Sequence, residues 1–364
     1  MVENSKKIMV LGATGYTGRL IVAELQRKGL PFAIAGRSPE RLAALRAEFK
    51  LDEATPSVVA NPLQPETLPA LFESEVGLLI NCAGPFTRLG APVVRQALEH
   101  GSHYLDITGE QAYIAHTITA FHLLALAQQR VAIPGCGVEY ALSNWLAALA
   151  ALDLEPLDSL ATATATLNLQ TSQGTQRSLF AALGSYGLGW RNGRRVVKLT
   201  GSEVRRFRFP PPFGEQTAVW TPFGDSVTLP RHIKVQRVDS YLALPAPAAF
   251  GLQLISPLLP IVSTTLGFVL DKAVGLRQRG PQEEARQANQ WALVAEAIGP
   301  KGRRTVTLQG RDVYGLTAVI VVWAAEQMLS PGFDKAGILG PAQAFNPATA
   351  IEYLKGFGVE FTSE

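Results

Sequence analysis

The stretch Gly12-Ala13-Thr14-Gly15-Tyr16-Thr17-Gly18 decides the fold of this chain. It follows an apolar run, Ile8 to Leu11, and precedes a helical pattern from Arg19 to Arg27. A buried strand that opens through glycines into a helix lets backbone amides approach a pyrophosphate. We expect Gly12 to form the tight turn, Gly15 to leave room beside the phosphate and Gly18 to permit close helix–strand packing. The pattern predicts a dinucleotide-binding turn, with these residues at the cofactor: Gly12, Thr14, Gly15, Tyr16, Thr17 and Gly18.

The end of the second predicted strand, Phe32 to Ala35, indicates which dinucleotide would bind. The strand runs into Gly36-Arg37-Ser38-Pro39-Glu40-Arg41, and no carboxylate stands where the ribose of NAD would need one. Arg37, Ser38 and Arg41 instead offer a guanidinium fork, a hydroxyl and a second charge to a 2′-phosphate. The sequence therefore favours NADP(H) over NAD(H).

Residues 1 to about 135 alternate short apolar runs with helical patterns, as expected for a doubly wound parallel sheet. The predicted strands are Ile8–Leu11, Phe32–Ala35, Pro56–Val59, Gly77–Asn81, His103–Asp106 and Arg130–Pro134. The predicted helices between them are Gly18–Lys28, Glu40–Phe49, Pro65–Glu73, Ala91–His100 and Gln111–Gln129. We expect Pro92 to lie near a first helical turn, where proline is tolerated.

The alternation stops after a helix predicted at Leu142–Leu152, which marks a change of domain. We expect an α/β fold with an N-terminal Rossmann domain over residues 1–150 and an α+β domain for substrate or dimer contacts over 151–364. Strands are predicted in the second domain at Leu160–Gln170, Val196–Phe209, Val227–Leu229, Lys234–Leu244 and Thr305–Gly310, and helices at Gln290–Gly299 and Val313–Leu329.

Composition excludes several classes of protein. The 364 residues are 47% hydrophobic and 17% charged, which argues against disorder, and the net charge of +3 is too small to indicate a nucleic-acid partner. The two cysteines, Cys82 and Cys136, have no metal-ligand spacing with each other or with the five histidines, so we expect no metal. The short polar start, Met1 to Lys7, has no apolar signal core, and we expect a cytoplasmic protein.

One apolar segment complicates that interpretation. No charged residue occurs from Tyr241 to Leu270, while basic residues flank the segment on both sides. Its four prolines divide it into pieces too short to cross a bilayer, so two apolar helices in a hairpin or lid fit better. A peripheral membrane or lipid contact and a buried dimer or domain interface are both consistent with this pattern.

The chemistry is expected just after strands four, five and six, because a cofactor lies over the carboxyl ends of a parallel sheet. After strand four, Asn81, Ala83, Gly84 and Pro85 are predicted to contact the cofactor. Asp106, Thr108 and Tyr140 are the candidate catalytic residues that follow strands five and six. Glu110 and Glu139 are further carboxylates in these segments, and each carboxylate either meets the substrate or holds a turn or helix end.

These motifs together resemble the saccharopine dehydrogenase-like oxidoreductases, which include the trans-acting enoyl reductases. The resemblance rests on Leu11–Gly18, Ala35–Arg37, Asn81–Phe86, Tyr104–Glu110 and Gly337–Ala342. It implies a Rossmann domain with an α+β second domain, NADPH as cofactor and a homodimer. The chain departs from the family pattern at Gly137–Asn144, where the family has Gly-Phe-Asp-Ser-Ile-Pro-Ser-Asp, and one glycine of Ser-Gly-Gly-Thr is replaced in Ser172–Thr175.

Two functions of different classes follow. The first is an NADPH-dependent reductase acting on a carbon–carbon double bond of an apolar, lipid-like or polyketide-like molecule, with a proton from Tyr140, Thr108 or water. The second is a non-catalytic NADP(H)-binding protein attached to a membrane or lipid surface. A short-chain dehydrogenase is disfavoured, because no Tyr-x-x-x-Lys pair follows strand four or five.

Overall fold

The computed structural model describes residues 7–176, 186–258 and 280–363. The chain forms two compact units, each assembled from separate parts of the sequence. Unit 1 comprises Met1–Thr108, Tyr113–Gly137 and Tyr314–Leu339, and unit 2 comprises Gly109–Ala112, Val138–Val313 and Gly340–Glu364. This division differs from the single boundary expected at residue 150, because a late segment of the chain returns to unit 1.

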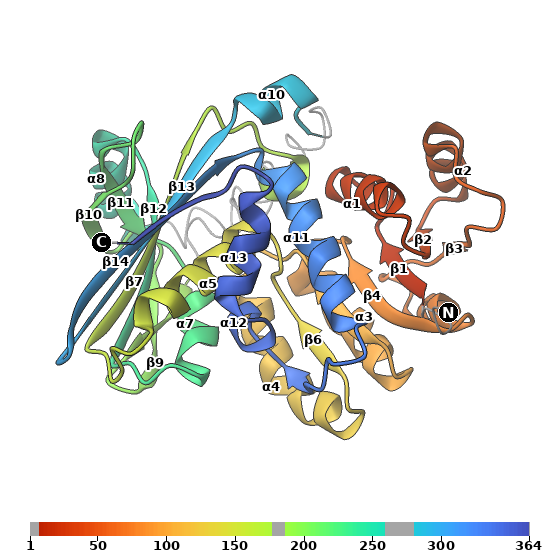
Figure 1. The fold of residues 1–364 in the computed structure, drawn as a ribbon, viewed down its shortest axis with the longest axis horizontal. Helices are drawn as coiled ribbons and strands as arrows, with labels where there is room; N and C mark the ends of the chain where they lie inside the picture. Colours follow the sequence, from red (N-terminus) through yellow and green to blue (C-terminus); the bar gives the residue numbers. More distant parts are fainter. Residues whose placement is uncertain (1–6, 177–185, 259–279, 364) are drawn as a thin grey trace. The chain divides into compact units, whose positions relative to one another are not determined.

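Unit 1 contains a parallel sheet whose order, among the described residues, is β15-β6-β5-β4-β1-β2-β3 (Figure 1). Its strands are β1 (Lys7–Leu11), β2 (Phe32–Gly36), β3 (Ser57–Val59), β4 (Val76–Asn81), β5 (His103–Asp106), β6 (Val131–Ile133) and β15 (Gly337–Ile338). The strand order reverses beside β1, which pairs with both β2 and β4. The predicted doubly wound Rossmann sheet is confirmed, and its topology places the glycine turn at the reversal point where such sheets bind dinucleotides.

The helices between the first six strands follow the predicted alternation. They are α1 (Tyr16–Arg27), α2 (Pro39–Phe49), the 3-10 helix η1 (Pro65–Phe72), α3 (Phe86–Glu99) and α4 (Gln111–Ala127). The helix predicted separately at Val313–Leu329 is α11 (Val313–Met328). The structure corrects one detail, because α3 begins at Phe86 and Pro92 lies inside the helix rather than near its first turn. Pro85 is the N-cap of α3, so the helix begins at Phe86 and not at the predicted Ala91.

The seventh strand of the unit 1 sheet, β15, was not predicted. It is two residues long and pairs in parallel with β6, with the amide of Gly337 donating to the carbonyl of Arg130 at 2.9 Å. So short a strand carries no periodicity that a sequence pattern could reveal.

Unit 2 is built on a mixed sheet in the order β10-β11-β12-β7-β13-β14-β16, to which β8 and β9 add at β12. Its strands are β7 (Ser159–Leu167), β8 (Tyr186–Arg191), β9 (Arg194–Leu199), β10 (Val204–Arg208), β11 (Glu215–Trp220), β12 (Arg237–Ala243), β13 (Gln290–Gly299), β14 (Gly302–Arg311) and β16 (Glu360–Ser363). The helix α5 (Val138–Ala151) packs against β7, β13 and β14 (Figure 1). The predicted α+β character of the second part of the chain is confirmed.

Three sequence predictions in unit 2 were wrong. Gln290–Gly299 is the strand β13 rather than a helix, since it lies between β7 and β14 and is mostly buried. Val227–Leu229 is helical, within α7 (Asp225–Thr228) and η2 (Leu229–Arg231). Val196–Phe209 is divided into β9 and β10, because the chain turns at Gly201, whose φ is +79°.

Unit 2 also contains, within the described residues, the helices α8 (Ala246–Ile255), η3 (Ser256–Leu258), α10 (Glu283–Ala288), α12 (Pro341–Ala344) and α13 (Pro347–Lys355). The apolar segment predicted at 241–270 is described only to residue 258, and its remainder lies outside the described residues. Within the described ranges, no helix combines the length and apolar character that crossing a bilayer requires. Ser172 caps the short helical turn that follows it, because its Oγ accepts from the amide of Thr175 at 3.2 Å.

Candidate functional site

The glycine turn has the geometry that its sequence predicts. Gly12 adopts a φ of +79°, and a Cβ at this position would lie 2.9 Å from the carbonyl carbon of Cys82. A Cβ on Gly18 would collide with the carbonyl oxygen of Gly12, so the start of α1 packs directly on the turn. The predicted roles of Gly12 in the turn and of Gly18 in close packing are therefore confirmed.

The N-terminus of α1 is free of acidic side chains. Gly15 is the N-cap and supplies no side-chain cap, while its own amide donates to Gly12 O at 2.9 Å. The first turn, Tyr16 to Gly18, carries no carboxylate. The positive end of the helix dipole and the amides at this end suit an anion such as a pyrophosphate. Contact of Thr14, Tyr16 and Thr17 with a cofactor stays a prediction.

The three residues predicted to meet the 2′-phosphate have different surroundings. Arg37 is exposed directly after β2. Ser38 is the N-cap of α2, where its Oγ accepts from the amide of Arg41 at 3.3 Å and donates to Glu40 at 2.6 Å. Arg41 donates from Nη2 to the carbonyl of Thr14 at 3.0 Å, so it joins α2 to the glycine turn. Arg37 thus presents the exposed guanidinium, while Ser38 and Arg41 also shape the loop.

The loop after β4 is held by the buried side chain of Asn81. Its Oδ1 accepts from the amide of Ala83 at 2.9 Å, and its Nδ2 donates to the hydroxyl of Tyr104 at 3.0 Å. The amide of Cys82 donates to the carbonyl of Leu11 at 2.8 Å, which ties this loop to the end of β1. The segment from Asn81 through Gly84 to Pro85 therefore lies beside the glycine turn, as the predicted cofactor contact requires.

Asp106 connects the carboxyl ends of three neighbouring strands. The residue is fully buried, and its Oδ1 accepts from the amides of Thr108 at 3.0 Å and Gly135 at 2.8 Å. Its Oδ2 accepts from the hydroxyl of Tyr104 at 2.8 Å, and that hydroxyl also bonds Tyr113 at 2.9 Å. Burial raises the pKa of Asp106 to about 6, against the opposing effect of these hydrogen bonds. Asp106 and Thr108, both predicted as catalytic, lie together here and are both buried.

Unit 2 holds the third predicted catalytic residue, Tyr140, in the first turn of α5. Its hydroxyl donates to the carbonyl of Gly109 at 2.8 Å and the side chain is buried. Burial, followed by the charges of Glu139 and Asp225, raises the pKa of Tyr140 well above its ordinary value. At neutral pH this phenol therefore holds its proton firmly.

Glu139, beside Tyr140, has a pKa close to neutral pH. Burial and then the charge of Asp225 raise its pKa to about 7. One carboxylate oxygen lies 3.9 Å from the position that a Cβ of Gly109 would take, and the residue as a whole is partly exposed. A carboxyl group with these properties is suited to proton transfer near pH 7.

Sequence reasoning missed Asp225, which lies in the short helix α7. It is fully buried and accepts from Ser143 at 3.1 Å, Asn144 at 3.3 Å and Thr162 at 2.8 Å. These donors hold the carboxylate in place, and its charge raises the pKa of Glu139. Burial raises the pKa of Asp225 as well. The polar pair Ser143 and Asn144, which the departure from the family pattern had singled out, was the available signal.

Neither cysteine has the surroundings of a reactive thiol. Burial, followed by the nearby charge of Asp106, raises the pKa values of both Cys82 and Cys136 above that of a free thiol. Among the described residues, no group of three or more histidine, cysteine or acidic side chains is arranged to hold a metal ion.

A comparison with known protein families shows which proteins the first part of the chain resembles. Residues 8–152 match the family model described as the saccharopine dehydrogenase NADP-binding domain. Over these residues the chain is similar to the NADP-binding domain of saccharopine dehydrogenases. The family resemblance predicted from the sequence and the choice of NADP are confirmed over this domain.

Trans-acting enoyl reductases are similar in sequence to part of this chain. A trans-acting enoyl reductase of Mycobacterium ulcerans is 33% identical over 136 residues, which are 36% of this chain and 32% of the relative. A trans-acting enoyl reductase of Mycobacterium leprae is 34% identical over 135 residues, also 36% of this chain and 32% of the relative. The chain thus matches about a third of the length of these relatives.

A solved structure shows the same fold over nearly the whole chain. The apo saccharopine dehydrogenase (L-Glu forming) of Saccharomyces cerevisiae aligns with a TM-score of 0.67, covering 99% of this chain and 100% of that one. The sequence identity is 11%, so this likeness concerns the fold alone. The NADP-binding domain is therefore joined to a second unit of the saccharopine dehydrogenase fold.

Proposed function

We propose that this protein is an NADPH-dependent oxidoreductase that reduces a carbon–carbon double bond in an apolar, lipid-like or polyketide-like substrate. The observation that carries the proposal is Arg37, exposed directly after β2 next to a glycine turn whose helix end has no carboxylate. The NADP-binding domain and the relatives named trans-acting enoyl reductase support the activity and the type of bond. The apolar run that begins at Tyr241 favours an apolar substrate.

The residues of unit 1 would bind and orient the cofactor. NADPH supplies a hydride when bound. The glycine turn and the amides at the start of α1 would hold the pyrophosphate, and Arg37 would pair with the 2′-phosphate. Asp106 acts as a positioning residue in this proposal, because all its described bonds fix the strand ends where the nicotinamide half would lie.

Among the candidate proton donors, Glu139 has the strongest physical case. A proton must reach the substrate carbon next to the one that receives hydride, and a donor works best with a pKa near the working pH. The pKa of Glu139 is about 7, whereas that of Tyr140 is raised well above its usual value. Asp106 and Thr108 are buried within their own hydrogen bonds. We assign proton donation to Glu139 and the orientation of Gly109 to Tyr140.

Cofactor binding and turnover, each measured with NADPH and with NADH, test the proposal. The purified chain is titrated with NADPH and NADH by nicotinamide fluorescence, and a panel of apolar enoyl thioesters is then added. We expect tighter binding of NADPH and oxidation of NADPH only with the unsaturated acceptor. If the corresponding 3-ketoacyl thioesters are reduced and the enoyl compounds are not, the proposed bond type is incorrect.

A second function is favoured by the surface of α8 and η3. Phe250, Leu254 and Leu258 are 54%, 81% and 60% exposed. Such a face supports an NADP(H)-binding protein that attaches to a membrane or lipid surface without catalysis. Cosedimentation with vesicles and no turnover of any acceptor would favour this alternative. Cytoplasmic residence and a homodimer remain part of the main proposal, and equilibrium sedimentation tests the dimer.

A further inference from the structure

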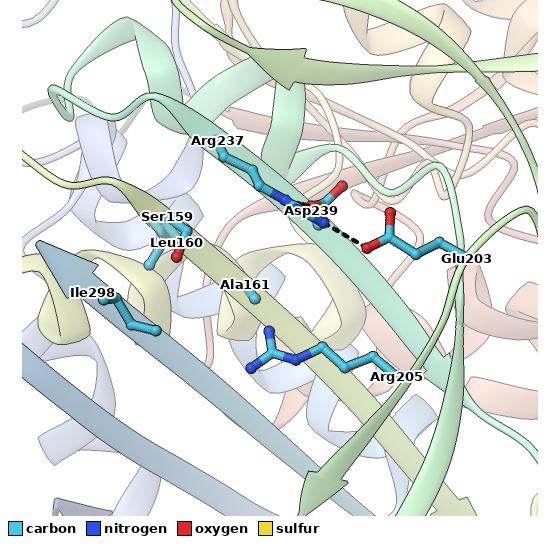
Figure 2. A pocket seen from close by; sticks show the side chains of 8 residues that line it. All are labelled: Ser159, Leu160, Ala161, Glu203, Arg205, Arg237, Asp239 and Ile298. Atoms are coloured by element: carbon cyan, nitrogen blue, oxygen red, sulfur yellow. Dashed lines mark hydrogen bonds and ion pairs between the residues drawn. The ribbon is translucent and has the colours of Figure 1, made fainter.

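A pocket of about 300 Å³ opens in the sheet of unit 2, at residues that neither the cofactor turn nor the Glu139 cluster uses (Figure 2). It is lined by Ser159, Leu160, Ala161, Glu203, Arg205, Arg237, Asp239 and Ile298. Its volume lies at the lower end of the range for small-molecule sites.

The acidic side of the pocket is already neutralised by the protein. The side chain of Asp239 is 2% exposed and accepts from Arg237 at 2.6 Å, from Arg191 at 2.7 Å and from Lys198 at 3.2 Å. Glu203 accepts from Lys198 at 2.7 Å, from Tyr241 at 2.9 Å and from Arg237 at 2.5 Å. Both oxygens of Glu203 are therefore engaged.

The basic side chains are more accessible and retain donors. The side chains of Arg205 and Arg237 are 37% and 43% exposed. Arg205 pairs with Glu296 and lies over the ring of Phe207 at 4.5 Å, which fixes its direction. A guanidinium has five N–H donors, and the described bonds of Arg237 use two of them.

The charges of this cluster do not cancel. Four cations face three carboxylates: Arg191, Lys198, Arg205 and Arg237 against Glu203, Asp239 and Glu296. The excess of one positive charge, with two partly exposed guanidinium groups, suits one bound anionic group.

One side of the pocket is apolar. Figure 2 shows Ile298 on the side opposite Glu203, with Ala161 above the guanidinium of Arg205. Ile298 is 37% exposed, so it offers an apolar surface that a ligand would cover. A ligand that satisfies both sides therefore combines an anionic head with a short hydrocarbon part.

We propose that this pocket binds a small carboxylate with a short hydrocarbon chain, whose head bonds Arg205 and Arg237 and whose chain covers Ile298. The carboxylate matches the guanidinium fork, and the chain gains contact with the apolar side of the pocket.

Calorimetric titration of the full chain with acetate, butanoate, hexanoate and inorganic phosphate, at constant ionic strength, tests this proposal. We expect saturable binding that tightens by up to about fourfold for each CH₂ group. Arg205→Gln should weaken hexanoate binding at least tenfold, and Ile298→Ser should flatten the dependence on chain length. The matched control is Arg206→Gln, because Arg206 is the next residue of β10, is 71% exposed and does not line the pocket.

Circular dichroism and the affinity for NADPH show whether each variant is folded. The proposal is overturned if the wild type binds none of the carboxylates saturably at tens of millimolar. It is also overturned if phosphate binds as tightly as hexanoate, or if Arg206→Gln weakens binding as much as Arg205→Gln does.

Discussion

The hydroxyl of Tyr104 donates to Oδ2 of Asp106 at 2.8 Å, and both side chains are completely buried. The same hydroxyl accepts from Asn81, whose Oδ1 holds the amide of Ala83. Through Gly135, Asp106 also reaches the segment after β6. One carboxylate thus fixes the ends of β4, β5 and β6, where a doubly wound sheet places its cofactor.

The first prediction concerns this pair. Asp106→Asn replaces an accepting oxygen with a donating amide, and Tyr104→Phe removes the hydroxyl that links Asp106 to Asn81. Each change should lower the free energy of unfolding by about 1.5–3 kcal/mol, because a buried charge-assisted hydrogen bond is lost. Each should also weaken NADPH binding several-fold. Chemical denaturation and fluorescence titration measure the two effects, and an unchanged NADPH affinity in both folded variants would exclude the positioning role.

The second prediction concerns the choice of cofactor. Arg37→Asp should weaken NADPH binding about 10- to 100-fold and improve NADH binding, because a charge-assisted contact is replaced by repulsion of the 2′-phosphate. Lys50→Asn is the control, since it removes a positive charge at the opposite end of α2, where Lys50 has a φ of 50° that asparagine tolerates. Equal losses in the two variants would mean that only long-range charge is sensed.

The third prediction concerns proton donation. If Glu139 delivers the proton, turnover should fall above about pH 7, because its pKa is about 7. Glu139→Gln should lower kcat about 100-fold or more and abolish that decline, while NADPH affinity stays unchanged. Tyr140→Phe should retain the decline. A wild-type decline that persists unaltered in Glu139→Gln would assign the titrating group to another residue.

The fourth prediction concerns stability and pH. The folded-state pKa of Glu139 lies above its ordinary value of 4.5, so its contribution to stability is fully present below pH 4.5 and is lost as pH rises through 7. The rise of the pKa from 4.5 to about 7 limits this loss to about 3 kcal/mol, and the residue is partly exposed. Glu139→Gln should therefore be more stable than the wild type at pH 8 and similar at pH 4. Urea unfolding at the two pH values measures the free energy of unfolding of each protein. Tyr140→Phe should not show this gain over the wild type at pH 8.

The fifth prediction concerns close packing at the glycine turn. Gly18→Ala places a methyl group against the carbonyl oxygen of Gly12, a backbone atom that cannot move aside cheaply. We expect a loss of about 1–3 kcal/mol of stability together with weaker NADPH binding. Gly332→Ala is the control in the same unit, because no atom lies within 4 Å of its added Cβ. Thermal unfolding that shows equal shifts in both variants would contradict the packing argument.

The parallel sheet was predictable because its signals are local. Strands β1 and β5 fall within one residue of their predicted ranges, since each is a short buried run next to a turn. The ten residues of β13 were mistaken for a helix because alanine, leucine and glutamate have high helix propensity. Pairing with β7 and β14 on both edges outweighs that propensity, and those partners lie far away in the sequence.

The residues of the candidate site also fall into those that local sequence patterns reveal and those that only the folded chain brings together. The residues of the glycine turn and of the end of β2 act through backbone geometry within a few positions, so their spacing revealed them. Asp225 meets Ser143 across 82 positions and Thr162 across 63, and no local pattern marks such a meeting.

By itself the sequence determined the dinucleotide turn, the parallel strands around it and the preference for NADP, because each depends on residues that are neighbours along the chain. Only the tertiary structure decided that Asp106 is bound at the junction of three strands, that β13 is extended and that Glu139 lies near Asp225. These outcomes depend on burial and on partners from distant segments, whose effects on hydrogen bonding and on pKa exist only once the chain has folded.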